Sequence, residues 1–273
     1  YATAFNKGFT PNTVLFDLAT EFQTTCDAYG RALPGRNQKD CYKPDNYDGK
    51  FRGPINLRDA LAQSINIIAV KLFYLAGLSD SLKTAEDMGI KTLTDIGRYG
   101  LTLVIGGGEV SLLDMTSSYG VFANDGIRSS YTGILKIEDL NGNILEEFRP
   151  NSWEVLPKNT ALTISDILSD EKSRIPTFGA HSALFVPGKN IAVKTGTTNN
   201  NKDAWTIGYT PSVVVGVWAG NNDNKAMKKG GVALAGPIWN KFISEALKVL
   251  PNEKFEKPNL EIDPQAVKPA LRG

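Results

Sequence analysis

Histidine and cysteine are nearly absent from this chain. Of its 273 residues, one is a histidine, His181, and two are cysteines, Cys26 and Cys41. A histidine-based catalytic triad or a site with several histidine ligands therefore has too few residues to form, and the cysteine spacing fits no zinc pattern. The sequence predicts no metal and no cofactor.

The two cysteines leave two interpretations open. One structural disulfide between Cys26 and Cys41 would suit a protein that works in an oxidising compartment outside the cytoplasm. Two unrelated thiols are the alternative. A disulfide needs Cα atoms closer than about 7 Å, and the sequence alone does not give that distance.

An excess of charge of one sign and a long apolar run are also missing. The chain has 30 basic and 29 acidic residues, so its net charge of +1 offers no broad basic surface for nucleic acid. No apolar stretch approaches the roughly 18 residues of a membrane span, since the run Ile67–Val70 is followed at once by Lys71. The chain has no initiating Met and no signal peptide, so we expect a segment of a longer protein.

Local patterns predict a mixture of helices and strands. Residues 9–53 are rich in Pro, Gly and Asn without a sustained period, which indicates a long loop. Asn56 precedes apolar positions at helical spacing, which predicts one continuous helix ending at Gly77. Further helices are expected over Leu112–Ala123, Asn159–Leu168 and Pro237–Leu250.

Strand patterns occur in two regions. Asn141-Gly142 lies between alternating runs within Thr132–Phe148, which predicts a hairpin. The second region contains three strand candidates joined by short connections, which predict an antiparallel meander: Ile191–Thr197, Ala204–Tyr209 and Val213–Ala219. The proline-containing end from Pro251 is typical of a tail or linker.

Two short motifs carry the residues on which chemistry can depend. They are Ser64-Ile65-Asn66, in the first expected helix, and Lys194-Thr195-Gly196-Thr197-Thr198, on the first strand of the meander. Each motif alone arises often by chance. Together and in this order, they match two of the three motifs of penicillin-binding proteins and related β-lactamases.

The sequence around the motifs is more specific than the motifs themselves. It resembles the transpeptidase domain of class A, bifunctional penicillin-binding proteins. The resemblance covers roughly residues 1–248. It rests on these further segments: Leu57–Leu61 ahead of the first motif, Gly108–Met115, Phe122–Gly126, Asp203–Trp205, Gly208–Pro211 and Gly216–Gly220.

The resemblance implies catalytic roles for three residues. Ser64 would pass protons, because a hydroxyl both donates and accepts. Asn66 would bind the amide of the donor peptide and help to hold the general-base lysine. Lys194 would supply positive charge near the substrate carboxylate and tune proton transfer.

It also implies substrate-binding roles for Thr195, Gly196 and Thr197. The two threonine hydroxyls would hold the carboxylate, and hydrogen bonds to a charged group contribute about 1.5–3 kcal/mol each. Gly196 would let the strand edge come close to the ligand. The backbone N–H of Thr197 would form half of the oxyanion hole.

The chain departs from the family pattern at the nucleophile. The family's Ser-x-x-Lys motif should precede Ser64, and we expect it upstream of Tyr1. The single internal match, Ser169–Lys172, follows the first motif in an acidic segment, so we interpret it as an exposed helix end. We therefore expect the isolated chain to be inactive.

The fold that the resemblance implies is α+β, the penicillin-binding-protein/β-lactamase-like transpeptidase fold, with an antiparallel sheet flanked by helices and a mainly helical lobe. Residues 1–250 would form the transpeptidase domain without its N-terminal strands and nucleophile helix, and residues 251–273 a tail or linker. Without the upstream strands, the edge of the strand Val213–Ala219 would be uncovered, which is an association hazard.

The leading hypothesis is a serine D,D-transpeptidase that cross-links peptidoglycan stem peptides and that β-lactams acylate. A β-lactamase or carboxypeptidase on the same fold is one alternative, and a catalytically inactive binding or sensor module is another. The expected partners are stem peptides, β-lactams and the upstream segment of the same protein, without nucleic acid. The location would be extracytoplasmic, with a membrane anchor elsewhere in the full-length protein.

Overall fold

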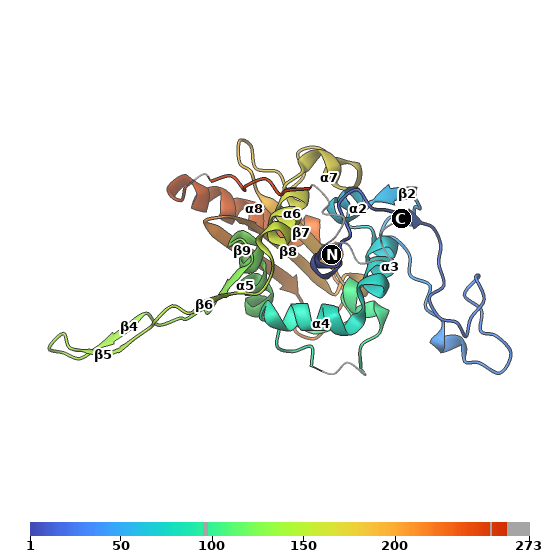
Figure 1. The fold of residues 1–273 in the computed structure, drawn as a ribbon, viewed down its shortest axis with the longest axis horizontal. Coiled ribbons are helices and arrows are strands. Elements are labelled where there is room, and N and C mark those ends of the chain that lie inside the picture. Colours follow the sequence, from blue (N-terminus) through green and yellow to red (C-terminus); the bar gives the residue numbers. More distant parts are fainter. Residues whose placement is uncertain (95–97, 252, 261–273) are drawn as a thin grey trace.

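A three-stranded antiparallel sheet lies at the centre of the fold (Figure 1). The computed structural model describes residues 1–94, 98–251 and 253–260. The strand order is β7–β8–β9, with the bounds β7 Ala192–Thr197, β8 Asp203–Thr210 and β9 Val213–Gly220. The expected meander is confirmed, and within the described residues β9 pairs with β8 alone.

Helices cover both faces of this sheet. Ala192 packs with α5 (Leu112–Ala123) and α6 (Lys158–Leu168) in one apolar cluster, whereas Val193 packs with Trp239 and Ile243 of α8 in another. Because successive residues of a strand point to opposite faces, the two clusters lie on opposite sides of the sheet. The mixed α+β fold with a flanked antiparallel sheet is confirmed.

The helix α8 spans Gly231–Val249, so it starts six residues before the Pro237 at which we expected it to begin. A proline inside a helix leaves one hydrogen bond unmade but fits the first turn, so the sequence alone favours a helix that begins at Pro237. In the structure, the missing side chains of Gly230 and Gly231 allow this first turn to lie against β7, because an added Cβ would come within 3.0 Å of Thr197 and of the Gly196 carbonyl, respectively.

A mainly helical lobe lies beside the sheet and contains the first sequence motif. Its own apolar cluster is formed by buried residues such as Leu57, Ile68 and Leu72. The helices of this lobe and of its surroundings are α1 Ala2–Asn6, α2 Leu57–Ala62, α3 Asn66–Ala76, α4 Leu78–Asp87 and α7 Glu171–Phe178.

The expected hairpin at Asn141-Gly142 is confirmed, and it projects from the body as an arm (Figure 1). The pair β3 (Ile127–Ser129) and β6 (Ser152–Glu154) forms the base, and the pair β4 (Lys136–Glu138) and β5 (Ile144–Glu147) forms the tip. Every residue of β4 and β5 is exposed, so the arm contributes little to the apolar core.

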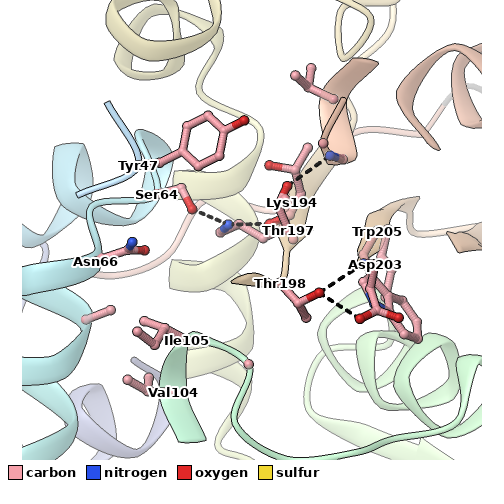
Figure 2. A pocket seen from close by; sticks show the side chains of 18 of the residues that line it. Tyr47, Ser64, Asn66, Val104, Ile105, Lys194, Thr197, Thr198, Asp203 and Trp205 are labelled. Carbon is pink, nitrogen blue, oxygen red and sulfur yellow. Dashed lines mark hydrogen bonds between the residues drawn. The ribbon is translucent and has the colours of Figure 1, made fainter. Parts of the chain in front are cut away.

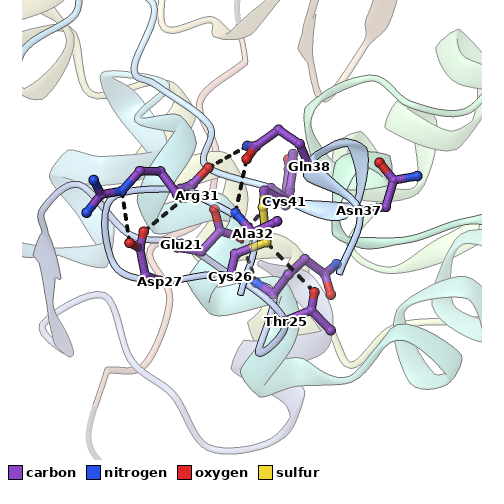
Figure 3. The surroundings of a disulfide bond; sticks show 12 residues. Glu21, Thr25, Cys26, Asp27, Arg31, Ala32, Asn37, Gln38 and Cys41 are labelled. Carbon is purple, nitrogen blue, oxygen red and sulfur yellow. Dashed lines mark hydrogen bonds and ion pairs between the residues drawn. A yellow bond between two sulfur atoms is a disulfide. The ribbon is translucent and has the colours of Figure 1, made fainter. Parts of the chain in front are cut away.

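The long segment before the first motif leaves the body and returns to it. It runs from β1 (Val14–Asp17) through the short helix η1 (Gln38–Asp40) to β2 (Gly53–Asn56), which pairs with β1. Cys26 and Cys41 form a disulfide within it, with Cα atoms 5.7 Å apart (Figure 3). Of the two interpretations of these cysteines, the disulfide is the one found. The Glu21 carboxylate lies next to the two sulfurs, but the disulfide removes the thiolates that a metal would need.

The segment after α8 turns back along α6. Phe255 packs edge-on against Tyr209 at 5.5 Å between ring centroids, and Lys257 forms an ion pair with Asp166 at 2.7 Å. Residues 261–273 of the expected tail lie outside the described residues. No helix in the described part of the chain is long and apolar enough to cross a membrane.

Candidate active site

One cleft contains all six residues that the sequence singled out. Its volume is ≈ 1090 Å³. Four parts of the chain form its walls: the α2–α3 junction, the outer edge of β7, the start of α8 and residues 103–110. The last of these begins within the short helix η3 (Leu101–Ile105). Ser64 and Asn66 lie on the helical wall, whereas Lys194 and the residues that follow it lie on the strand wall (Figure 2). The fold therefore brings together two motifs that are far apart in the sequence.

Ser64 lies at a break between two helices, so the expectation of one continuous helix from Asn56 to Gly77 is wrong. The helix α2 ends at Ala62, and α3 starts at Asn66. Ser64 donates its backbone N–H to Leu61 O at 3.1 Å, and Ile65 donates to Ala60 O at 2.9 Å. This pair of hydrogen bonds is the Schellman motif, which ends a helix with one residue in the left-handed conformation.

That left-handed residue is Ser64, with φ at 59°. Among the described residues, three other helices end with the same pair of hydrogen bonds, and all three use a glycine: Gly8 after α1, Gly89 after α4 and Gly106 after the short helix η3. A side chain in this conformation costs roughly 1 kcal/mol that glycine avoids. The backbone alone would favour glycine at this position, yet the residue is a serine that lines the cleft.

Lys194 reaches across the cleft to that hydroxyl. Its ammonium donates to Ser64 Oγ at 2.6 Å and to the carbonyl of Thr195 at 2.6 Å (Figure 2). Burial lowers the pKa of Lys194 from its ordinary value of 10.5 to about 8. Because this pKa lies near neutral pH, the side chain can both carry positive charge and exchange a proton.

Asn66 is the first residue of α3, and it lines the same cleft. Its side-chain amide donates to the backbone carbonyl of Asp45 at 2.9 Å. Asp45 belongs to the returning part of the disulfide-containing segment. A loop 21 residues earlier in the sequence therefore contacts the amide that we expected to face substrate.

The edge of β7 presents backbone groups to the cleft. Thr198 donates its N–H to Asp203 O of β8 at 3.2 Å. Since N–H groups alternate sides along an antiparallel strand, the N–H of Thr197 points to the opposite edge, where β7 pairs with no strand of the described part of the chain. The Thr195 carbonyl lies on that edge too, as its contact with the Lys194 ammonium shows.

The side chains of this strand are held by their neighbours. The Thr197 hydroxyl accepts a hydrogen bond from the Gly231 N–H at 2.9 Å, at the start of α8. A Cβ on Gly196 would lie 3.3 Å from the Cβ of Trp205, which also lines the cleft. Gly196 therefore leaves room for the tryptophan as well as for an approaching ligand.

A polar network at the end of β7 was missed by sequence reasoning. Thr198 donates its hydroxyl to Asp203 at 2.6 Å, and the indole N–H of Trp218 donates to the other oxygen of that carboxylate at 3.0 Å. The short helix η4 (Asn199–Asn201) connects β7 to β8 at this point. The sequence signal that could have indicated this network was the Asp203-Ala204-Trp205 segment. The sequence analysis used that segment only as part of the resemblance.

Ser169, in the internal Ser-x-x-Lys match, is not part of this cleft. It ends α6, and its hydroxyl donates to Asp166 O at 3.3 Å, while Asp170 caps the start of α7. This position agrees with the predicted helix end, but Ser169 is half-buried and not exposed as expected.

Comparison with known proteins gives the same assignment. Residues 2–244 match the penicillin binding protein transpeptidase domain. Penicillin-binding protein 1A of Aquifex aeolicus is 35% identical over 237 residues, which is 86% of this chain, and the protein of the same name from Neisseria lactamica is 31% identical over 267 residues, 95% of this chain. The chain spans about a third of the length of these relatives, 32% of each.

Solved structures show the same fold. Penicillin-binding protein 1A from Haemophilus influenzae superposes with a TM-score of 0.78 at 24% identity, covering 94% of this chain and 42% of that one. The PonA1 protein of Mycobacterium tuberculosis in complex with penicillin V gives 0.75 at 23% identity, covering 96% and 70%. On the match over residues 2–244, this chain belongs to the penicillin-binding protein transpeptidase domain family.

Proposed function

We propose that this chain forms the greater part of a D,D-transpeptidase domain, which cross-links peptidoglycan stem peptides through a serine acyl-enzyme. The observation that carries the proposal is the hydrogen bond of 2.6 Å between Lys194 and Ser64, set beside the open edge of β7. Acyl transfer needs proton transfer, an oxyanion hole and a means of orienting the substrate, and the cleft offers residues for all three.

In the proposed reaction, a serine hydroxyl attacks the carbonyl that joins the last two residues of a donor peptide. That peptide bond breaks, the terminal amino acid leaves with a proton, and an amine of a second peptide later displaces the serine oxygen. Ser64 would relay the proton between the nucleophile and the leaving nitrogen. The Thr197 N–H would donate to the oxyanion, and such a donor is worth about 2.7–4 kcal/mol in other enzymes.

The terminal carboxylate of the donor would bind next to Lys194. The protonated ammonium attracts it, and the Thr195 and Thr197 hydroxyls donate to it. The Asn66 amide would hold the donor peptide's own amide on the opposite wall. The penam carboxylate and acylamino group of a penicillin have the same chemistry as these two parts of the peptide, which is why we expect β-lactams to bind here.

The nucleophile itself is not identified in these 273 residues. No Ser-x-x-Lys stands ahead of Ser64, so we propose that another part of the protein supplies it and that the chain alone forms no acyl-enzyme. The activity of the whole protein, its location outside the cytoplasm and a membrane anchor belong to the same proposal. The Cys26–Cys41 disulfide supports an oxidising compartment.

Covalent labelling with a fluorescent penicillin tests this function. We expect the 273-residue chain to stay unlabelled and the protein expressed from the whole gene to be labelled. In that protein, Lys194→Ala and Ser64→Ala should each slow labelling at least tenfold, about 1.4 kcal/mol in activation free energy. The matched control is Ser169→Ala, which removes a hydroxyl outside the cleft and should leave the rate unchanged.

Four results would contradict parts of the proposal. A label mapped by mass spectrometry to a serine of the isolated chain would show that the nucleophile lies within it. An unlabelled whole protein would favour the inactive binding module. Rapid release of the acyl group as hydrolysed penicillin would favour a β-lactamase, whereas release of only the terminal amino acid from a peptide, without cross-linking, would favour a carboxypeptidase.

A further inference from the structure

Asn46 occupies the point at which the disulfide-containing segment returns to the body of the protein. Its side chain is 4% exposed, although both of its chain neighbours, Asp45 and Tyr47, are exposed. The Asp45 carbonyl accepts the hydrogen bond from Asn66, and Tyr47 lines the cleft. A buried polar residue therefore separates two positions that contact the candidate active site.

The Asn46 amide joins three parts of the chain. Its nitrogen donates to both carboxylate oxygens of Asp17, at 2.8 and 2.9 Å, and to Lys50 O at 2.8 Å. Its oxygen accepts the backbone N–H of Ile67 at 3.1 Å. Asp17 is fully buried and also accepts a hydrogen bond from the backbone N–H of Arg52. Hydrogen bonds of Asn46 and Asp17 therefore connect β1, the loop at Lys50–Arg52 and the start of α3.

The bond to Ile67 takes the place of a missing helix cap. The first turn of a helix leaves N–H groups without partners, and a polar side chain at the N-cap normally accepts one of them. The N-cap of α3 is Ile65, which has no such side chain. Asn46 accepts the N–H of Ile67 instead, from a different part of the fold, and Ile67 directly follows Asn66.

We infer that Asn46 is a positioning residue for Asn66. It fixes the first turn of α3 through Ile67 and, through the adjoining Asp45 carbonyl, fixes the Asn66 carboxamide. One N–H of Asn66 is then held by the loop, and the rest of the carboxamide is presented to the cleft. The inference rests on the proposed function, in which Asn66 binds the amide of the acyl donor.

Two penams that differ in one group distinguish misplacement of the Asn66 carboxamide from a general loss of activity. Benzylpenicillin carries the acylamino group that Asn66 would bind, whereas penicillanic acid has the same bicyclic carboxylate without it. In the protein expressed from the whole gene, we expect Asn46→Leu to lower the ratio of their acylation rate constants at least fivefold. The control Asn37→Leu, which removes the cap of η1 in the same segment, should leave the ratio unchanged.

The Asn66→Ala background tests the route of the effect. If Asn46 acts through Asn66, Asn46→Leu should not change the ratio further once Asn66 is alanine. An unchanged ratio in the single variant, or the same fall in both backgrounds, would overturn the inference. Failure of the unaltered protein to react with either penam would overturn the proposed function instead.

A measurement on the 273-residue chain does not depend on acylation. Asn46→Ser is the second variant, for use if Asn46→Leu does not fold. Serine is small and polar, so we expect the fold to tolerate it, but its side chain is too short to contact Asp17 and Ile67 together. We expect hydrogen exchange at the Ile67 amide to become at least tenfold faster, while amides of α5 keep their rates. Unchanged exchange at Ile67 would show that Asn46 does not fix the start of α3.

Discussion

The two walls of the cleft are built in different ways. The strand wall is regular backbone, in which one edge of β7 carries groups that face the cleft and a neighbouring strand pairs with the other edge. The helical wall is a break, in which Ser64 takes a left-handed conformation between α2 and α3. One wall presents its polar groups through ordinary strand geometry, whereas the other places the Ser64 hydroxyl where the backbone would favour glycine.

The difference shows where each wall has freedom to change. The strand wall depends on close packing of α8 against β7, since there is no room for a side chain on Gly231. The helical wall instead contains local strain, which its hydrogen bonds and the surrounding apolar cluster offset. An added side chain at Gly231 should therefore destabilise the strand wall, whereas glycine in place of Ser64 should relieve strain in the helical wall.

Packing at the strand wall gives the largest expected change in stability. A Cβ on Gly231 would lie 2.4 Å from Gly196 O and 2.8 Å from Trp205 O, both of them backbone atoms that cannot move cheaply. Gly231→Ala should lower the free energy of unfolding by about 3 kcal/mol, measured by urea denaturation.

The matched control is Gly120→Ala in α5. An added Cβ there has no atom within 4 Å, so the helix should gain about 0.5–1 kcal/mol. Equal stability of Gly231→Ala and the unaltered chain would mean that α8 does not pack closely on β7, and the contrast between the walls would be lost.

Titration of Lys194 gives the next largest effect. Its pKa falls from 10.5 to about 8 on folding, so between these values the unfolded chain holds a proton that the folded chain has released. Stability should therefore rise with pH in that window, by at most about 3 kcal/mol, relative to Lys194→Met. Urea titrations of both proteins at pH 7.5 and pH 10 measure it, and parallel changes in the two would show that Lys194 titrates normally.

Strain at the helical wall gives the smallest effect. Ser64→Gly and Ser64→Ala both remove the hydroxyl, so both lose the contact with Lys194. Only glycine relaxes the left-handed backbone, and we expect Ser64→Gly to be more stable than Ser64→Ala by about 1 kcal/mol. A thermal melt of the pair suffices. If alanine were the more stable of the two, the left-handed conformation of Ser64 would not be a source of strain.

Sequence reasoning predicted the strand wall better than the helical wall, for physical reasons. Val213–Trp218 and its neighbours combine β-branched residues with short connections, so their pattern admits few structures. The break at Ser64 was missed because the usual sign of a Schellman motif is glycine. The remaining sign was two poor helix formers, Ser64 and Asn66, close together in an apolar stretch.

Long-range contacts set the other limit. All six proposed site residues line one cleft, but the resemblance, rather than periodicity, singled them out. The contact of Asn66 with Asp45 and the cap that Asn46 supplies join segments about 20 residues apart through a loop without a regular pattern. Such contacts follow from the folded path of the chain and not from local propensity.

A double-mutant cycle on Ser64 and Lys194 tests the coupling of the two walls most directly. The acylation rate constant with benzylpenicillin would be measured in the protein expressed from the whole gene, for Ser64→Ala, Lys194→Met and the double variant. Residues that act as one unit give non-additive losses. We expect the double variant to be no more than about twofold slower than the slower single variant. Losses that multiply, or single variants that react at the unaltered rate, would contradict a proton path from Lys194 through Ser64.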